Sequence, residues 1–184
     1  SEGFKEAFAT LNRNKALLGI HPSYHASDNP ALLNKEIKQL SHDSGATIEF
    51  SRQHYLRMKI DETPESLMVN GILADFTMGF ASAPGFRAGT AYAFHYFDLK
   101  RNMARPLLMV PFCAMDGAYT IYERVNDEKA LSSLLQLAEE VKNTGGNFIT
   151  VFHERSFYDH LYPRFGTLYK NLHLHLKGGF SPEK

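Results

Sequence analysis

The chain of 184 residues sets 20 lysines and arginines against 20 aspartates and glutamates, so its formal net charge is zero. This balance argues against a general binder of nucleic acids or anionic membranes, because such proteins depend on a cationic surface. The longest apolar run, about RPLLMVPFCAM, is far shorter than the roughly 20 residues that span a bilayer. We therefore expect no nucleic-acid partner and no membrane span.

Length and composition predict one domain over residues 1–184, because 43% hydrophobic residues can bury a sizeable core. The first residues, SEGFKEAF, are polar and helical in pattern, which does not indicate a signal peptide and favours a cytoplasmic location. The single cysteine, Cys113, excludes an internal disulfide and a cysteine-rich zinc site. Because it lies within an apolar run, we expect a small buried side chain, with a catalytic thiol as the alternative.

Apolar periodicity and end signals predict helices that alternate with short strands, which indicates an α/β fold built from parallel β/α units. Residues 79–105, rich in glycine, alanine and aromatic residues, have no helical period and predict a long loop with an irregular strand. In chain order, the other expected elements are a helix over 4–13, a strand ending at Ile20, a helix capped by Asp28 or Asn29 and closing near Gly45, a strand over 46–51, a short helix beginning near Pro64, an apolar segment over 73–81, a strand over 106–112, a helix capped by Asn126 or Asp127 and ending at 144–146, a strand over 147–153 and a helix over 165–179.

Polar side chains stand at the end of several predicted strands. In α/β proteins, sites form where loops leave the carboxyl ends of parallel strands, so these residues are the candidates for a site. They are His21, Arg52, His54, Asp75, Asp116 and His153.

His21 and His25 have the spacing H-x-x-x-H, which puts two imidazoles on one side of a helical turn. Neutral imidazoles suit zinc, cobalt or nickel, and a carboxylate usually completes such a site. The alternative is a pair of ordinary loop histidines. A rival pair, His173 and His175, would point about 200° apart on a helix and could share a metal only on a strand.

Three motifs carry a resemblance to a known family. GIHPSYHAS resembles the metal-binding motif of the polysaccharide deacetylases, the chitin and peptidoglycan deacetylases of carbohydrate esterase family 4. SRQHYL resembles the Arg-x-Pro-Tyr motif of that family, with His54 in the proline position, and ITVFHERS resembles its strand ending in Leu-x-His. The segment between them is similar to a subgroup found in bacterial surface-polysaccharide gene clusters. The matches follow the family's order over about 17–156.

The resemblance implies a distorted (β/α) barrel with a divalent metal, usually zinc, at its mouth. Hydrolysis would then proceed by attack of a metal-activated water on an acetyl carbonyl of a carbohydrate. By the same resemblance, the metal ligands are His21 and His25, Arg52 orients an acidic group, Tyr55 belongs to the substrate groove and His153 is the general acid that protonates the leaving amine. Asp75 and Arg87 are further candidates for substrate binding, with an ion pair to a nearby carboxylate as the alternative for Arg87.

The family's opening pair of aspartates and its Asp-x-x-Asp-Trp motif have no counterpart in this chain, which contains no Asp-Asp and no tryptophan. We therefore expect either a partial barrel without its N-terminal strands or a degenerate domain. The open edge of a partial barrel would be covered by the chain's own tail, a second subunit or a rearranged sheet. Asp75, Asp116 and Glu154 are the candidates for a metal-binding carboxylate. A non-catalytic carbohydrate-binding or scaffolding domain is the alternative function.

Overall fold

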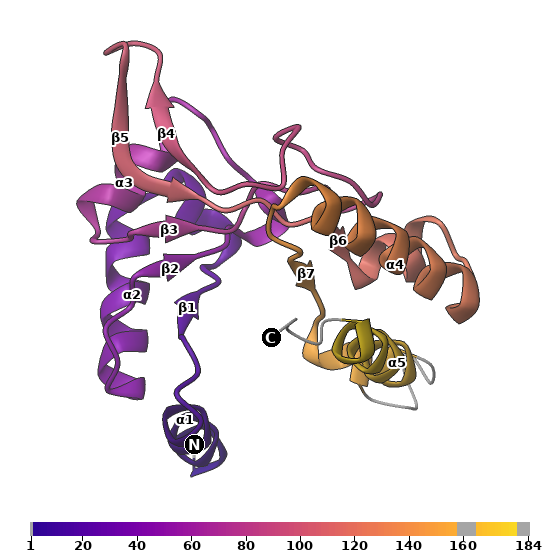
Figure 1. The fold of residues 1–184 in the computed structure, drawn as a ribbon. Helices are drawn as coiled ribbons and strands as arrows, with labels where there is room; N and C mark the ends of the chain where they lie inside the picture. The colour runs from indigo at the N-terminus through magenta and orange to yellow at the C-terminus, as the bar shows by residue number, and fades with distance from the viewer. Residues whose placement is uncertain (1, 158–164, 180–184) are drawn as a thin grey trace, which may run out of the picture. The chain divides into compact units, whose positions relative to one another are not determined.

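The computed structural model describes residues 2–157 and 165–179 (Figure 1), which pack as two compact units. The first unit contains Ser1–Met78 and Ala93–Val110, and the second contains Gly79–Tyr92 and Pro111–Lys184. The single domain expected from the length stays a prediction, and each unit is described by itself below.

The first unit is built on a five-stranded sheet in the order β1-β2-β3-β5-β4 (Figure 1). All neighbouring pairs are parallel except β4 and β5, which are antiparallel. The expected α/β class with parallel strands is therefore confirmed, whereas closure into a barrel stays a prediction. The strands are β1 (Gly19–Ile20), β2 (Phe50–Ser51), β3 (Ala74–Asp75), β4 (Phe94–Asp98) and β5 (Met103–Met109).

Local sequence signals explain where the helices of the first unit begin and end. In α2 the side chain of Asn29 accepts a hydrogen bond from the Leu32 N–H at 3.1 Å, Pro30 opens the helix, and Gly45 closes it at φ +70°. The helices expected over 4–13 and near Pro64 are confirmed as well. The elements are α1 (Glu2–Arg13), α2 (Pro30–Ser44), α3 (Thr63–Val69) and the 3₁₀ turns η1 (Tyr24–Asp28) and η2 (His54–Leu56).

The core of the first unit joins the helices to the sheet. Leu33 and Ile37 on α2 and Leu67 on α3 are buried together with Leu107 and Met109 on β5. The predicted apolar stripe of α2 is thus the face that packs. Burial of such side chains, at about 1.5–3 kcal/mol each, holds the short parallel strands in register.

The second unit has a two-stranded parallel sheet of β6 and β7 and two helices. Asn126 caps α4 by accepting from the Lys129 N–H at 2.9 Å, and Gly145 ends it at φ +81°, as the sequence predicts. The core contains Leu134 from α4 and Leu168 from α5. The elements are β6 (Ala114–Met115), the π-helix η3 (Ala118–Tyr122), α4 (Asp127–Thr144), β7 (Thr150–Val151), the 3₁₀ turn η4 (Glu154–Phe157) and α5 (Phe165–Gly179).

Two neighbouring residues show how tightly the second unit is packed. Phe112 is fully buried, and a Cβ at Gly79 would lie 2.3 Å from its ring, so only glycine fits beside it. Cys113 is buried, and this burial raises the pKa of its thiol to about 11. Because the thiol stays protonated at neutral pH, the structure supports the small buried side chain rather than the catalytic alternative.

The long loop with an irregular strand expected over 79–105 is confirmed, because residues 79–93 form no helix or strand and β4 follows with an irregular register. Beyond the loop, β4 and β5 form an antiparallel hairpin whose register shifts between His95 and Phe97. The turn passes through Asn102 at φ +51°. The sequence analysis did not predict that these two strands pair with each other. Asparagine tolerates positive φ better than most residues, which suits it to this turn.

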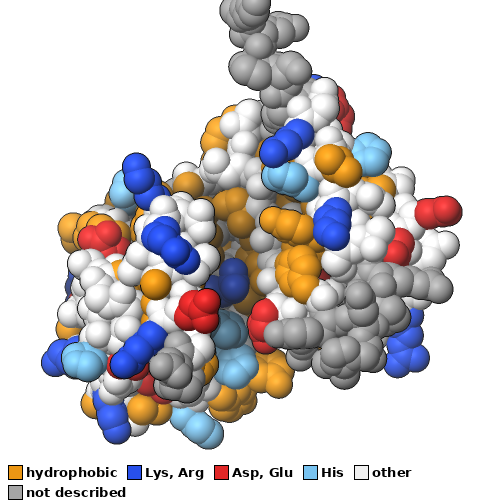
Figure 2. Space-filling model, turned by 90° about the horizontal axis from the view of Figure 1, so that it is seen from below, with side chains coloured by type: hydrophobic (Ala, Val, Ile, Leu, Met, Phe, Trp, Pro, Cys, Tyr) orange, Lys and Arg blue, Asp and Glu red, His pale blue; other side chains and the backbone are white. Residues whose placement is uncertain are grey.

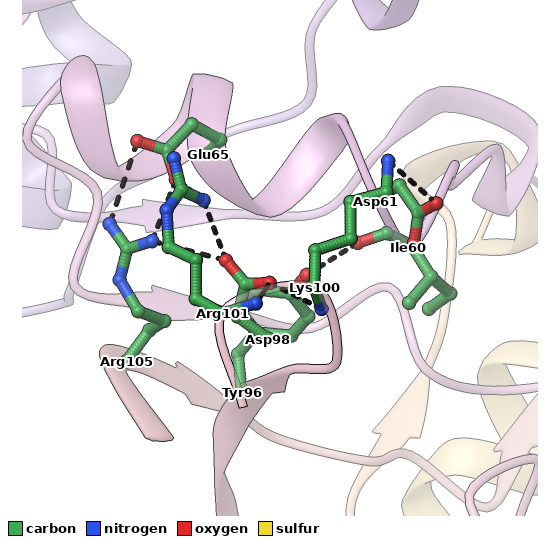
Figure 3. A network of polar contacts seen from close by, with 8 residues as sticks. All are labelled: Ile60, Asp61, Glu65, Tyr96, Asp98, Lys100, Arg101 and Arg105. Carbon is green, nitrogen blue, oxygen red and sulfur yellow. Dashed lines mark hydrogen bonds and ion pairs between the residues drawn. The ribbon is translucent and has the colours of Figure 1, made fainter. Parts of the chain in front are cut away.

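A network of ion pairs ties this hairpin to α3 (Figure 3). The buried carboxylate of Asp98 accepts from Arg101 at 2.6 Å and from Arg105 at 3.3 Å. Arg105 also contacts Glu65 of α3 at 3.0 Å. The Tyr96 hydroxyl donates to a backbone carbonyl at 2.8 Å (Figure 3), so the hairpin is held by both charged and neutral contacts.

The substitution Asp98→Asn is expected to weaken the fold at neutral pH and to remove part of its acid dependence. The Arg101 guanidinium, and then the backbone N–H groups of the turn, lower the pKa of Asp98 from 3.8 to about 2. A carboxylate whose folded pKa is lowered contributes stability above its unfolded pKa and loses it as the pH falls toward the folded value. Urea unfolding midpoints of wild type and variant should therefore differ at pH 7 and converge as the pH approaches 2.

Asp61→Asn is the matched control, because Asp61 is about half exposed and pairs with Lys100 at 3.0 Å. An exposed pair of this kind contributes little, so its unfolding midpoints should follow those of the wild type. If the effect of Asp98→Asn were equally large at pH 7 and pH 2, the buried carboxylate would not be its source.

The surface carries charges of both signs. Figure 2 shows Lys and Arg side chains interspersed with Asp and Glu on the face that it draws. Among residues 2–157 and 165–179, no helix is long and apolar enough to cross a membrane.

Candidate functional site

In the first unit, polar residues gather at the carboxyl ends of three neighbouring parallel strands. His21 follows β1, Arg52 follows β2 and Asp75 ends β3. The first two line a pocket of about 290 Å³, together with Ser51 and apolar side chains that include Phe50 and Phe76. The structure thus places three of the predicted site residues on one edge of one sheet.

His21 is held in one orientation by the neighbouring strand. Its Nδ1 lies 2.7 Å from the backbone oxygen of Arg52. A carbonyl oxygen only accepts hydrogen bonds, so Nδ1 carries the proton and Nε2 carries the lone pair of the neutral ring. Histidines that bind metals are commonly oriented in this way. The ring also lies 4.9 Å from that of His54, a contact that the sequence did not predict.

His21 and His25 do not share a helical turn, so the geometric argument from their spacing is wrong. The 3₁₀ turn η1 begins only at Tyr24, after an extended Ser23 with ψ 159°. Ser23 is fixed there by Glu36, whose carboxylate accepts from the Ser23 N–H at 2.9 Å and from its hydroxyl at 2.5 Å. His25 is exposed on η1 and packs edge-on against Tyr24.

The donor groups for a metal are incomplete within the residues that the structure describes. No group of three or more His, Cys, Asp or Glu side chains lies there in a position to hold a metal ion. Zinc normally takes four ligands in a structural site, or three and a water in a catalytic one. Two histidines therefore do not form a metal centre by themselves, and metal binding by His21 and His25 stays a prediction.

Asp75 is completely buried and reaches no solvent, so it is not positioned to contact a substrate. The Ser51 hydroxyl donates to one carboxyl oxygen, and the Thr77 N–H donates to the other at 2.9 Å. Burial raises the pKa of Asp75 in spite of these hydrogen bonds. Its side chain connects the ends of β2 and β3 and thereby positions the residues that follow them.

Gln53 is a feature that the sequence analysis missed. Its backbone N–H donates to the Thr77 hydroxyl at 2.9 Å, and its side chain is almost fully buried. Neither the amide oxygen nor the amide nitrogen has a hydrogen-bond partner among the described residues. Such an orphaned amide costs about 1–3 kcal/mol, and nothing in the polar pattern of the sequence signals it.

Tyr55 projects from η2 in an unusual backbone conformation. Both Tyr55 and Leu56 have positive φ, at +53° and +52°. The Leu56 side chain is buried, whereas the Tyr55 side chain is 75% exposed. The predicted substrate-binding residue is thus held out into solvent by a turn whose next residue is anchored in the core.

In the second unit, the carboxyl ends of β6 and β7 bring Asp116 and His153 together. His153 Nδ1 lies 2.7 Å from one carboxylate oxygen of Asp116, and the His153 N–H donates to the other at 2.8 Å. Nδ1 therefore carries a proton, and Nε2 lies on the side of the ring away from Asp116. The carboxylate is buried, while the imidazole is 31% exposed. The Asp116 carboxylate thus fixes the orientation of the His153 ring, and the ring remains accessible to solvent.

Asp116 is stabilised as a carboxylate by more than the histidine. Burial by itself raises the pKa of Asp116, but hydrogen bonds from His153 and then Ser156 outweigh it, and the net pKa lies below the usual value. The Gly117 N–H donates to the same group at 2.7 Å. Sequence reasoning placed Asp116 at a strand end as a metal-ligand candidate, but it did not predict the contact with His153 or any role for Ser156.

The other two candidates in the second unit are exposed. Arg87 lies in the loop over 79–92, and Glu154 lies in the first turn of η4, directly after His153. In the first unit, Arg52 directly follows β2, and Tyr55 lies in η2, the 3₁₀ turn that comes next. The predicted residues therefore form two groups, one in each unit.

Neither a model of a protein family nor a curated protein sequence matches the chain. One solved structure, described as that of a "putative polysaccharide deacetylase from Mycobacterium smegmatis", is similar to it with a TM-score of 0.62 and 17% sequence identity. The similarity covers 94% of this chain and 60% of the other, so this chain spans about three fifths of its neighbour. The chain thus has the α/β fold of a polysaccharide deacetylase-like protein, as its motifs indicated.

Proposed function

We propose that this protein is a metal-dependent hydrolase that removes acetyl groups from an amino sugar or a polysaccharide. In this proposal its parallel strands belong to a distorted, partial (β/α) barrel. The observation that carries the proposal is the pair of Asp116 and His153 at the ends of two parallel strands. The deacetylase-like fold supports it.

His153 is suited to the role of general acid. The Nδ1–H group donates a hydrogen bond to a carboxylate oxygen of Asp116, with 2.7 Å between nitrogen and oxygen, so proton transfer takes place at Nε2. In the imidazolium form, Nε2 donates its proton to the amine nitrogen as the bond between acyl carbon and nitrogen breaks. The buried Asp116 carboxylate stabilises the imidazolium before this step and fixes the orientation of the ring throughout.

In the first unit, we propose that His21 and His25 contribute two ligands to a divalent metal, with zinc as the ion that suits imidazole donors best. In hydrolases such an ion supplies a nucleophilic water at neutral pH. Because no group of three His, Cys, Asp or Glu side chains among the described residues is placed to hold a metal, this proposal requires further ligands from outside them. Arg52, beside His21 in the same pocket, would orient an acidic group, and the exposed Arg87 would contact the substrate.

Acetate release tests the proposed activity. The chain is incubated with oligosaccharides of N-acetylglucosamine, with and without added zinc, and free acetate is measured enzymatically. Acetate release that depends on the metal supports the deacetylase. If no acetate is released but the oligosaccharide is bound, the alternative holds, and the protein is a carbohydrate-binding or scaffolding domain. The pair of a buried Asp116 and a solvent-accessible His153 favours the enzyme, because a binding domain has no need of an oriented histidine.

Replacing His21 by alanine is expected to weaken zinc binding at least tenfold, because it removes an imidazole that is already oriented for ligation. His25→Ala should have a similar effect if the two histidines bind the same ion. Competition with a chromogenic zinc chelator measures the affinity without any need for activity.

His42→Ala is the control for both variants, because His42 is an exposed histidine whose side chain is 85% accessible on α2. Its affinity for zinc should equal that of the wild type. Equal zinc affinity in all four proteins would show that His21 and His25 are ordinary loop histidines.

A further inference from the structure

The pocket beside His21 is much larger than an acetyl group needs. Its volume is about 290 Å³. An apolar cavity of about 150 Å³ already takes a benzene ring, which has twice as many heavy atoms as an acetyl group. One water molecule in the liquid occupies about 30 Å³, so roughly ten groups of that size would fill the pocket completely. A ligand somewhat larger than benzene therefore fits this space, whereas an acetyl group leaves most of it empty.

The inner walls of this pocket are apolar. The rings of Phe50 and Phe76 lie edge-on with their centres 6.3 Å apart, and both line the pocket. Leu17 and Ile20 line it from the side of β1. Between them Gly19 presents no side chain, since a Cβ there would lie 2.9 Å from the backbone oxygen of Phe50. An aliphatic chain that enters this space leaves water for apolar contacts, which favours its binding.

The polar groups of the pocket gather at the strand ends. His21 and Arg52 line it directly after β1 and β2. The guanidinium of Arg52 is always charged. Burial raises the pKa of Asp75, and the Arg52 charge is close enough to oppose that rise. None of the described residues that line the pocket is acidic, so its polar end suits the oxygens of a carboxyl group or an acyl group.

The opening of the pocket sets an upper limit on the length of an apolar ligand. Leu17 lines the pocket but is 80% exposed, so the wall that it forms lies at the solvent boundary. Chain atoms that reach beyond this wall stay in water and gain nothing from the pocket. The volume and the opening together therefore select chains of intermediate length.

We propose that this pocket binds an aliphatic acyl group of about four to six carbons, a size that follows from the volume estimate above. Its oxygens lie toward His21 and Arg52, and its chain packs against Phe50 and Phe76. This inference rests on the proposed function, because it takes the pocket beside His21 as the place of the acyl group. It goes further by assigning an acyl group longer than acetyl.

The test is a titration of the 184-residue chain with acetate, butyrate, hexanoate and octanoate, followed by the NMR shifts of backbone amides. In the wild type the Kd should fall about two- to fourfold for each methylene up to hexanoate, because a fully buried methylene contributes about fourfold and a partly buried one less. From hexanoate to octanoate the Kd should change less than about twofold, because the added methylenes reach solvent.

Two variants remove parts of the apolar wall. Phe76→Ala should raise the Kd for hexanoate about 5- to 10-fold, and Leu17→Ser about threefold, with little change for acetate. Leu17→Ser separates binding from folding, because an exposed side chain contributes little to the core and the melting temperature should stay that of the wild type. Phe97→Ala is the control, because Phe97 is a 46% exposed phenylalanine on β4, outside the pocket, and its loss should leave every Kd unchanged.

N-butyrylglucosamine distinguishes the two sources of such a chain. If the acyl group belongs to a sugar, this compound should bind more tightly than N-acetylglucosamine and compete with butyrate. If the ligand is the free acid, butyrate should bind alone, and Arg52→Gln should weaken it at least fivefold by removing the charge beside the carboxylate. Either result supports the pocket and names the molecule that carries the chain.

Two outcomes would overturn the acyl pocket. One is an equal Kd for acetate and hexanoate, and the other is a Kd that falls as steeply to octanoate in Leu17→Ser as in the wild type, which is non-specific association. These failures differ from that of the proposed function. Hexanoate binding that depends on Leu17 and Phe76, without release of acetate from any oligosaccharide, keeps the pocket and rejects the hydrolase. Acetate release together with a flat dependence on chain length keeps the hydrolase and rejects the longer acyl group.

Discussion

Substitution of Asp116 by alanine is expected to lower the free energy of unfolding by about 3–5 kcal/mol, because several donors lose a buried acceptor at about 1–3 kcal/mol each. The donors belong to His153, Ser156 and Gly117. The pKa of Asp116 is lowered from 3.8, so its contribution is present above about pH 4 and lost as the pH falls below that value. Urea unfolding at pH 7 and at pH 3, followed by circular dichroism, measures both effects.

Glu139→Ala is the matched control, because it removes an exposed carboxylate of the same unit. Glu139 lies 3.7 Å from Lys142 and is 61% accessible. Its loss should change the free energy of unfolding by less than about 0.5 kcal/mol. A similarly small effect for Asp116→Ala would mean that water replaces the carboxylate and that the pair with His153 is not structural.

Replacement of His153 by glutamine is expected to lower kcat for acetate release by about 10²- to 10⁴-fold, the usual contribution of a general acid. Asp116→Asn should cause a loss in the same range, because the amide no longer secures the proton on Nδ1 or stabilises the imidazolium. KM should change little in either variant. Steady-state kinetics of acetate release at pH 7 is the measurement for both variants.

Glu154→Gln serves as the control, because this exposed carboxylate follows His153 directly but makes no contact with Asp116 among the described hydrogen bonds. Its kcat should stay within about threefold of the wild type, since an exposed side chain outside the proton path contributes little. If His153→Gln kept wild-type kcat, another group would supply the proton and the proposed role of the pair would be wrong.

The sequence predicts helix ends well because the signals for them are local. Asn29, Pro30 and Gly45 bound α2, and Asn126 and Gly145 bound α4, each through contacts within a few residues. Short apolar runs likewise predict where the strands end, and therefore where the polar residues gather. The pairing of β4 with β5 was not predicted, because it depends on which residues of the two strands lie opposite each other. The apolar pattern within one strand carries no information about this register.

For the site residues too, positions were predicted from local sequence, whereas contacts between distant residues were not. His21, Arg52 and His153 were placed at strand ends from the sequence, and the structure has them there. The bond between His153 and Asp116, 37 residues apart, follows from the parallel pairing of Met115 with Val151, which brings the residues after both strands to one edge. The prediction for His25 was wrong because it assumed that His21 and His25 lie on one helical turn. The backbone at Ser23, between them, is extended.

β1 forms one edge of the five-stranded sheet in the first unit. β1 lies at the end of the sheet order and pairs with β2 alone in the part of the chain that the structure describes, so the cover expected for this edge stays a prediction. Its length of two residues limits how strongly it can recruit another strand. A strand that docked there in parallel would end beside His21 and bring its own terminal side chain to the histidine. Completion of the sheet and completion of the proposed ligand set would then be one event.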